Sequence, residues 1–238
     1  RNYKRSDYKG GTQNWNIDQD ENDNVYFANN DGLFQFDGSV WSKYTLPNKS
    51  VVRSIKTAKS GKIYVGGYNE FGYFKPDTNG RLVYFSLSKY LNKKNTSTID
   101  IIWKIHIYND EVIFQSFENA FILKNSRIKI MRPPSRFQFS FISGQRLFFQ
   151  DISNGILEYK NGTLHSLQNT TALNKTEVWG IINLSATQLL ISTLDKGLFL
   201  YENQQLKQWN TEANVFITKN SGLGGATIKN NYIALNSV

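Results

Sequence analysis

Short runs in which hydrophobic and polar residues alternate follow one another along the chain, separated by turns rich in Asn, Asp and Gly. Alternation with a period of two residues predicts half-buried β-strands. The first group of strands extends from Asn14 to Pro47. Its predicted strands begin at Trp15 and cover residues 25–28, 32–36 and 41–44. The turns at 22–24 and 37–39 contain Asn, Asp and Gly, which tolerate the positive φ of tight hairpins.

The same pattern recurs along the chain. Each copy contains a short motif in which Gly is followed by a hydrophobic residue and then by an aromatic or second hydrophobic residue. In the third copy Asn replaces the Gly. The marker residues are Gly32, Gly72, Asn119, Gly155 and Gly197, at intervals of 40, 47, 36 and 42 residues. Helical periodicity of useful length is missing, and the segment after Ser88 accounts for one turn at most. Four short strands in each repeat of about 41 residues predict the blades of a β-propeller.

The predicted fold class is therefore all-β, a single β-propeller of four-stranded antiparallel blades. About five and a half blades are expected, over residues 14–50, 51–95, 99–135, 136–177 and 178–221, with the start of a sixth at 222–238. A β-sandwich also has many short strands, but it has no reason to repeat its turn chemistry at fixed spacing. Because the sixth copy is interrupted at Val238, we expect the native chain to continue.

A ligand site is expected at one rim of such a propeller. The first strand of each blade lines the central channel, and the loop that enters it emerges on the same face as the loop between the second and third strands. The candidate ligand-binding residues at these positions are Trp15, Asn30, Arg53, Tyr68, Glu70, Trp103, Asn154, Trp179 and Asp195. Aromatic rings beside hydrogen-bonding groups suit a sugar. The alternative is structural: tryptophans pack between blades, and Asn and Asp form turns.

Composition limits the chemistry of this 238-residue chain. Cysteine is absent, which excludes disulfides, thiolate metal sites and thiol catalysis. Of the two histidines, His106 is expected to be structural and His165 to lie on the surface of an outer strand. The acidic and amide residues at 18–24 are expected to form a hairpin turn rather than a Ca²⁺ loop, since the glycine and the closing glutamate are missing. We predict no catalytic residues, no cofactor and no metal.

The chain is basic, with a formal net charge of +9. This excess favours anionic partners, but the basic residues are dispersed rather than gathered in a stripe, so nucleic-acid contact is not predicted. No run reaches the roughly 18–20 apolar residues that cross a bilayer. The segment that begins at Arg1 lacks the apolar core of a signal peptide.

Several segments resemble a known family. The most specific are DY at 7–8, QNW at 13–15 and EFGYF at 70–74. They are similar to the amino-terminal sensor region of Bacteroidetes regulators of the two-component-regulator-propeller type. The similarity covers essentially the whole chain, is strongest over residues 6–75 and is weak in the third blade.

The resemblance implies a periplasmic sensor that responds to polysaccharide breakdown products. In that family a signal sequence precedes the propeller. A Tyr-rich β-sandwich domain, a transmembrane helix, and either a histidine kinase or a LuxR-type helix-turn-helix follow it. The resemblance thus implies homodimers and a membrane tether outside this chain.

Three classes of function remain open. The first is a noncatalytic sensor domain of a membrane-bound transcriptional or two-component regulator, which binds an oligosaccharide at the rim and signals through dimer packing. The basic charge favours an anionic sugar. The second is a propeller enzyme acting on carbohydrate, and the third is a scaffold that contacts another protein.

Overall fold

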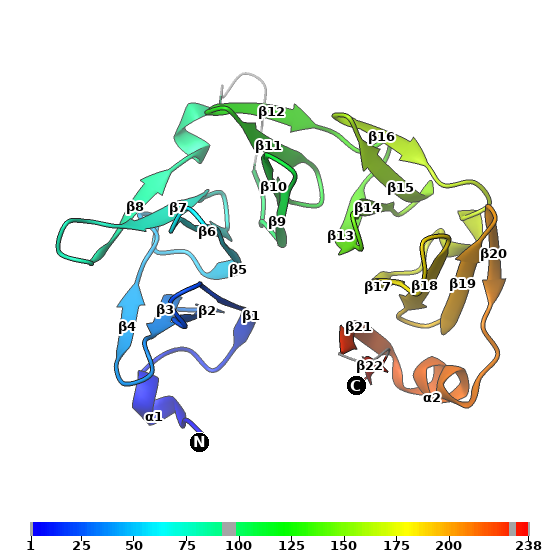
Figure 1. Ribbon diagram of the computed structural model, residues 1–238, viewed down its shortest axis with the longest axis horizontal. Helices are drawn as coiled ribbons and strands as arrows, with labels where there is room; N and C mark the ends of the chain where they lie inside the picture. Colours follow the sequence, from blue (N-terminus) through cyan, green and yellow to red (C-terminus); the bar gives the residue numbers. More distant parts are fainter. Residues whose placement is uncertain (1, 92–98, 229–231, 238) are drawn as a thin grey trace. The chain divides into compact units, whose positions relative to one another are not determined.

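The computed structural model describes residues 2–91, 99–228 and 232–237, and its regular structure is dominated by antiparallel β-strands (Figure 1). The chain divides into two compact units, Arg1–Arg132 and Pro133–Val238. Hydrophobic clusters lie between the sheets of each unit. In the part of the chain that the structure describes, no helix combines the length and apolar character needed to cross a membrane.

The first unit contains three four-stranded sheets, each a simple meander. Their strands are β1 (Asn14–Gln19), β2 (Val25–Asn29), β3 (Gly32–Phe36) and β4 (Trp41–Tyr44); β5 (Val52–Thr57), β6 (Ile63–Gly67), β7 (Phe71–Pro76) and β8 (Leu82–Ser86); and β9 (Lys104–Tyr108), β10 (Glu111–Gln115), β11 (Ala120–Lys124) and β12 (Arg127–Met131). A short helix α1 (Arg5–Tyr8) precedes the first sheet, and a 3-10 turn η1 (Ser88–Tyr90) follows the second.

The second unit contains two four-stranded sheets and a two-stranded one. Their strands are β13 (Phe137–Ser143), β14 (Arg146–Asp151), β15 (Gly155–Lys160) and β16 (Thr163–Ser166); β17 (Val178–Asn183), β18 (Gln188–Thr193), β19 (Leu198–Glu202) and β20 (Gln205–Gln208); and β21 (Gly222–Ile228) and β22 (Tyr232–Ser237). The unit also holds the 3-10 turn η2 (Thr171–Leu173) and the helix α2 (Glu212–Asn220).

The strands predicted at 32–36 and 41–44 have those bounds in β3 and β4. The expected hairpin turns are confirmed as well. Asp23 has a φ of 63° and Gly38 a φ of 96°, so both have the positive φ that these turns require. In the second sheet the corresponding turn residues are Gly61 and Gly80, with φ of 74° and 79°.

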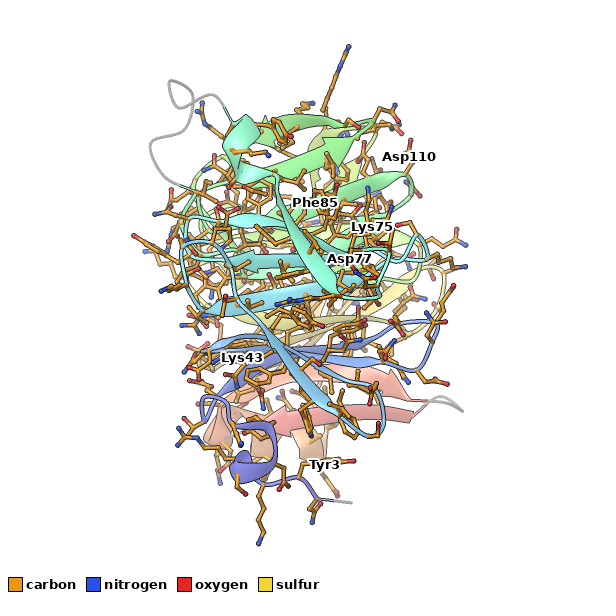
Figure 2. The ribbon with its side chains drawn as sticks, turned by 90° about the vertical axis from the view of Figure 1, so that its left-hand side faces the viewer. Tyr3, Lys43, Lys75, Asp77, Phe85 and Asp110 are labelled. Atoms are coloured by element: carbon orange, nitrogen blue, oxygen red, sulfur yellow. The ribbon has the colours of Figure 1, made fainter. Side chains whose placement is uncertain are left out.

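The core lies around the second strand of each four-stranded sheet. All residues of β6 are buried, and so are all but the first of β10, β14 and β18. The fourth strands are far more exposed, as Figure 2 shows for the outer edge of the first unit, with Lys43 on β4 and Phe85 on β8. Neighbouring sheets of a unit therefore bury their second and third strands against one another.

The prediction that helices of useful length are missing was wrong at α2. Thr211 caps this helix by accepting a hydrogen bond from the backbone N–H of Asn214. Only Asn214 and Ile217 of the helix are buried, whereas Val215 and Phe216 are exposed. With so few apolar residues on its inner face, the helix shows no clear 3.6-residue period in the sequence.

Candidate functional site

Three of the predicted site residues occupy the same structural position in three different sheets. Strand pairing skips one residue near the start of β1, β5 and β17, and the skipped residues are Trp15, Arg53 and Trp179. Such a β-bulge bends the strand and re-aims the side chain of the extra residue. The repeated bulge therefore turns these large side chains out of the ordinary alternation of the inner strands.

In the first unit the bulges bring aromatic rings around a cation. The guanidinium carbon of Arg53 lies 3.4 Å from the centre of the Trp15 ring and 5.2 Å from that of Trp103. Trp103 stacks in turn on Phe117, with 5.2 Å between ring centres and 22° between planes. The Trp15 indole N–H donates a hydrogen bond of 2.7 Å to Oδ1 of Asn30. We call these five residues the Arg53 platform.

Arg53 lacks a polar partner in this environment. Its Nε and Nη1 are buried, and within the described part of the chain they make no hydrogen bond. Nη2 is not among the buried unpaired atoms, so it is the guanidinium nitrogen that remains open to an incoming group. Burial lowers the pKa of Arg53, yet a guanidinium stays protonated at physiological pH. The platform therefore presents a partly desolvated positive charge between two indole rings.

Asn29, at the end of β2, holds the loop that carries Trp15. Its fully buried side chain accepts hydrogen bonds from the N–H groups of Gly11 (3.0 Å) and Asp31 (2.9 Å). Its amide donates to Gly11 O at 2.9 Å and to the side chain of Asn14 at 2.7 Å. One buried amide thus ties the residues before β1 to the β2–β3 loop, which fixes both Trp15 and Asn30.

Trp103 is held just before β9 by backbone bonds to two sheets. Its N–H donates to Gln115 O at 2.8 Å, and the N–H of Ile102 donates to Gly67 O at 3.1 Å. Ser54, next to Arg53, donates its hydroxyl to Ile102 O at 2.8 Å. The sheets that carry Arg53 and Trp103 are therefore joined directly beside the platform.

Glu70 and Tyr68, two other predicted site residues of this unit, are not part of the Arg53 platform. Oε1 of Glu70 accepts hydrogen bonds from the hydroxyls of Tyr84 (2.9 Å), Ser86 (2.8 Å) and Ser88 (2.7 Å). This carboxylate thus fastens the start of β7 to β8 and η1. The side chain of Tyr68 is half exposed, and its carbonyl accepts a hydrogen bond of 2.9 Å from Asn48.

In the second unit, Trp179 has a different environment from Trp15. Its indole N–H donates to Oε2 of Glu177 at 2.9 Å, and its ring meets Phe139 edge to face with 4.9 Å between centres. Phe139 lies in the register shift of β13, between Phe137 and Ser140. The irregular positions of β13 and β17 therefore place one aromatic ring against another.

Asn154 and Asp195 make contacts within and between loops. The amide and backbone N–H of Asn154 both donate to Oδ1 of Asp151, at 2.8 and 3.0 Å, in the β14–β15 turn. Oδ1 of Asp195 accepts a hydrogen bond from the hydroxyl of Thr176, which joins the β18–β19 loop to the segment before β17. The contacts of Asn154 are those of a turn-forming residue, the structural alternative considered for this position, whereas Asp195 links two loops.

The two histidines and the acidic turn are placed as follows. His165 is exposed on the outer strand β16, as predicted, and His106 is half-buried on β9. Asp20 accepts hydrogen bonds from the backbone and amide of Asn24 and from the hydroxyl of Tyr26, so its carboxylate is used within the β1–β2 hairpin. Within the described residues, no group of three or more His, Cys, Asp or Glu side chains has the arrangement of a metal site.

Sequence reasoning singled out four members of the platform but omitted Phe117 from the candidate residues. The organising role of Asn29 and the contact of Trp179 with Glu177 were missed too. The signal available for Phe117 is its place in the loop between the second and third strands of its blade. The bulges leave no mark in the spacing of hydrophobic residues, so nothing in the sequence pattern identified them.

Two cavities of the first unit lie apart from the platform. One of about 510 Å³ includes Tyr64, Tyr73 and Asp110 in its lining, and one of about 390 Å³ includes Tyr8 and Trp41. Neither includes a platform residue. We favour the platform over these two cavities as the ligand site because it holds the unpaired cation.

Repeated four-stranded meanders, with the candidate residues at the start of their inner strands, define a β-propeller protein. No protein-family model matches the sequence, and no curated protein matches it. Solved structures do. Two structures of the extracellular domain of BT4673 from B. thetaiotaomicron, a proposed one-component or hybrid two-component system, have TM-scores of 0.69 and 0.68 at 15% identity. The matches cover 94% and 95% of this chain, which spans only 30% of the length of either BT4673 chain.

Propellers of other functions are similar as well. An inactive variant of virginiamycin B lyase from Staphylococcus aureus, solved with quinupristin, has a TM-score of 0.69 at 12% identity, over 98% of this chain and 86% of its own. The WD40 β-propeller domain of Doa1 has a TM-score of 0.53 at 12% identity, over 97% of this chain and 92% of its own. The predicted β-propeller fold is confirmed, and a regulator of the kind that the sequence resembles is among the similar structures.

Proposed function

We propose that this chain is a noncatalytic, extracytoplasmic sensor domain of a membrane-bound transcriptional or two-component regulator. It binds a glycan fragment at the predicted rim, with the Arg53 platform as its contact surface. The observation that carries the proposal is the grouping of two indole faces, an amide and a free cation around the starts of β1, β5 and β9. The likeness to the BT4673 extracellular domain supports the sensor role.

The chemistry of the platform suits a sugar. The apolar face of a pyranose stacks on an indole ring, while its hydroxyls pair with amide and guanidinium groups. Trp103 and Phe117 form a stacked aromatic surface, and Asn30 and Arg53 supply the polar groups beside it. Bound oligosaccharide would change the packing of two such chains in a homodimer, and a tether outside this chain would pass that change across the inner membrane from the periplasm.

A lyase function is the second candidate, because virginiamycin B lyase has the same fold over nearly the whole chain. Two carboxylates of the first unit that could serve as a base are already used in other contacts. Glu70 accepts three hydroxyl hydrogen bonds on one oxygen, and Asp18 is bound to Lys56 at 3.0 Å and to Thr57. Neither carboxylate is placed as a free general base.

A thermal-shift screen against neutral and acidic oligosaccharides tests the sensor proposal. A ligand at about 100 times its Kd adds about 2.7 kcal/mol to the stability, enough to raise the Tm by several degrees. We expect at least one sugar to do so for the native chain and not for the Trp103→Ala variant. Phe85→Ala, which removes an exposed aromatic ring from β8, is the matched control and keeps the response.

Two results would contradict the proposal. If no sugar of the panel shifts the Tm, the role of a scaffold that contacts another protein takes its place. If incubation with quinupristin or with any oligosaccharide yields a cleaved product, the domain is an enzyme, and Glu70→Gln then shows whether that carboxylate takes part.

A further inference from the structure

The unpaired guanidinium of Arg53 carries information about the ligand itself. Buried polar groups in folded proteins almost always have hydrogen-bond partners, because leaving one unpaired costs free energy. Nε and Nη1 of Arg53 are buried and make no hydrogen bond within the described residues. A buried positive charge without a counter-charge is a still greater cost. The site is thus incomplete until something negative reaches it.

We propose that the sugar bound at the platform is acidic, and that Arg53 binds its carboxylate or sulfate group. This inference rests on the proposed sensor function. The incoming oxyanion meets Nη2 first, since that is the guanidinium nitrogen not buried. The ring of Trp15, 3.4 Å from the guanidinium carbon, covers one face of the cation, so the anion approaches in the guanidinium plane.

Two features of the platform and the net charge of the chain favour an anion over a neutral hydroxyl. The guanidinium attracts an oxyanion through the Coulomb interaction of two full charges, which a neutral hydroxyl lacks. Partial burial strengthens the attraction, because fewer water molecules screen it. The basic chain, with its net charge of +9, adds a long-range attraction for acidic sugars. Asn30 accepts the Trp15 N–H and leaves its amide N–H₂ as a further donor for a ligand oxygen.

The proposal also explains why indole rings, rather than a protein carboxylate, contact the guanidinium of Arg53. An ion pair with a protein carboxylate, such as that between Arg146 and Glu158, would neutralise the charge before a ligand arrived. Stacking on indole rings orients the guanidinium and offsets part of its desolvation cost without using its N–H groups. Arg53 is thereby held in position and kept available.

The test compares sugars that differ only in charge, by titrating the tryptophan fluorescence of the whole chain. Trigalacturonate and its methyl ester form the first pair. Every other sugar that raises the Tm in the screen is compared with its own uronate or ester counterpart. We expect the acid of a pair to bind at least tenfold more tightly than the neutral form, and the difference to shrink as salt is added.

Substitutions of Arg53 then locate the effect. Arg53→Gln should remove the preference for the acid, and Arg53→Lys should keep part of it, since an ammonium retains the charge but loses the planar fork. Arg81→Gln, at an exposed arginine just before β8, removes the same charge away from the platform and should leave the preference unchanged. The Tm of each variant shows that it is folded.

The outcomes separate the two proposals. If a neutral sugar binds as tightly as its acid, or if the preference survives in Arg53→Gln, the inference about charge is wrong while the sensor function stands. If neither member of any pair binds, the sensor function fails and the inference falls with it. A preference lost in Arg53→Gln and kept in Arg81→Gln supports both.

Discussion

Arg53 lies over the ring of Trp15, with 3.4 Å between the guanidinium carbon and the centre of the indole ring. Both residues are the extra residues of β-bulges, one in β5 and one in β1. The contact therefore joins the same position of two neighbouring sheets in the first unit. Because this pair joins an indole ring to the charge of the platform, substitutions of Trp15 and Arg53 test ligand binding directly.

Removal of the Trp15 ring should weaken ligand binding. In Trp15→Ala the indole no longer orients Arg53 or bonds to Asn30, and we expect the Kd of the responding oligosaccharide to rise about tenfold or more. Isothermal titration calorimetry measures the change. Phe85→Ala serves as the control, and an unchanged Kd in Trp15→Ala would show that the ligand binds away from the platform.

Removal of the Arg53 charge should change the stability little. Arg53→Met gives up cation–π contacts worth about 0.5–2 kcal/mol, but it also removes two buried N–H groups without partners. The two effects offset, so we expect the free energy of unfolding in urea to change by roughly 1 kcal/mol or less. A loss of about 3 kcal/mol or more would mean that Arg53 has a structural partner.

The ion pair of Glu158 should make the stability depend on acid pH. Burial works to raise the pKa of this carboxyl, but hydrogen bonds from Arg146 at 2.7 and 2.8 Å and from Lys160 outweigh it and hold the pKa below its usual value. A depressed pKa stabilises the fold above the unfolded value of about 4.3. That contribution is lost as the pH falls through the lower folded value.

Glu158→Gln tests this contribution. The variant removes the buried carboxylate that Arg146 and Lys160 share, and we expect a loss of about 2–4 kcal/mol near neutral pH and a smaller difference from the native chain in acid. Urea unfolding at several pH values measures both. Glu202→Gln, at an exposed position of β19, is the control and should change the stability by less than about 0.5 kcal/mol.

Glycines of the first sheet should differ in their tolerance of alanine. Gly32 has a φ of 128°, and an added Cβ would lie 2.3 Å from Tyr44 O. Gly38 has a φ of 96°, but nothing lies within 4 Å of its added Cβ. Gly32→Ala thus combines backbone strain with a clash and should cost about 3 kcal/mol or more, whereas Gly38→Ala should cost about 1–2. Equal losses of Tm in the two variants would contradict this.

Glu70 should prove to be structural. Glu70→Ala leaves the hydroxyls of Tyr84, Ser86 and Ser88 without their acceptor, and we expect a loss of about 1–3 kcal/mol. Ligand affinity, measured on the folded fraction, should stay the same. A variant that unfolds no more easily but loses binding would place Glu70 in the ligand site after all.

The strands and turns were predictable because their causes are local. Alternating residues define β3 and β4 to their ends, and Asn, Asp and Gly mark the hairpins whose φ values are positive. The glycine at or next to the start of the third strand, present in four of the five four-stranded sheets, marked the repeat for two separate reasons. Gly32 has a positive φ, whereas Gly72 needs no unusual φ but lies where a Cβ would be 2.2 Å from Phe85 O.

The platform was predictable only in part. Trp15, Arg53 and Trp103 share a place at or just before the first strand of their blades, so the sequence by itself determined which sheets carry them and at which end. It could not tell Glu70 from a ligand residue, because the three hydroxyls that bind its carboxylate come from residues 14 to 18 positions later. Nor did it mark the helix α2, whose inner face is set by contact with the last sheets.

Only the tertiary structure decided that Arg53 lies between Trp15 and Trp103. The deciding feature is a shift in strand pairing, from Val52 to Ser54 in β5 and likewise in β1. Such a shift depends on how a strand pairs with its neighbour, not on the strand's own residues, so a one-residue slip that re-aims a side chain is invisible in a pattern of period two. The sequence determines the blades, and the pairing between strands determines which of their side chains meet.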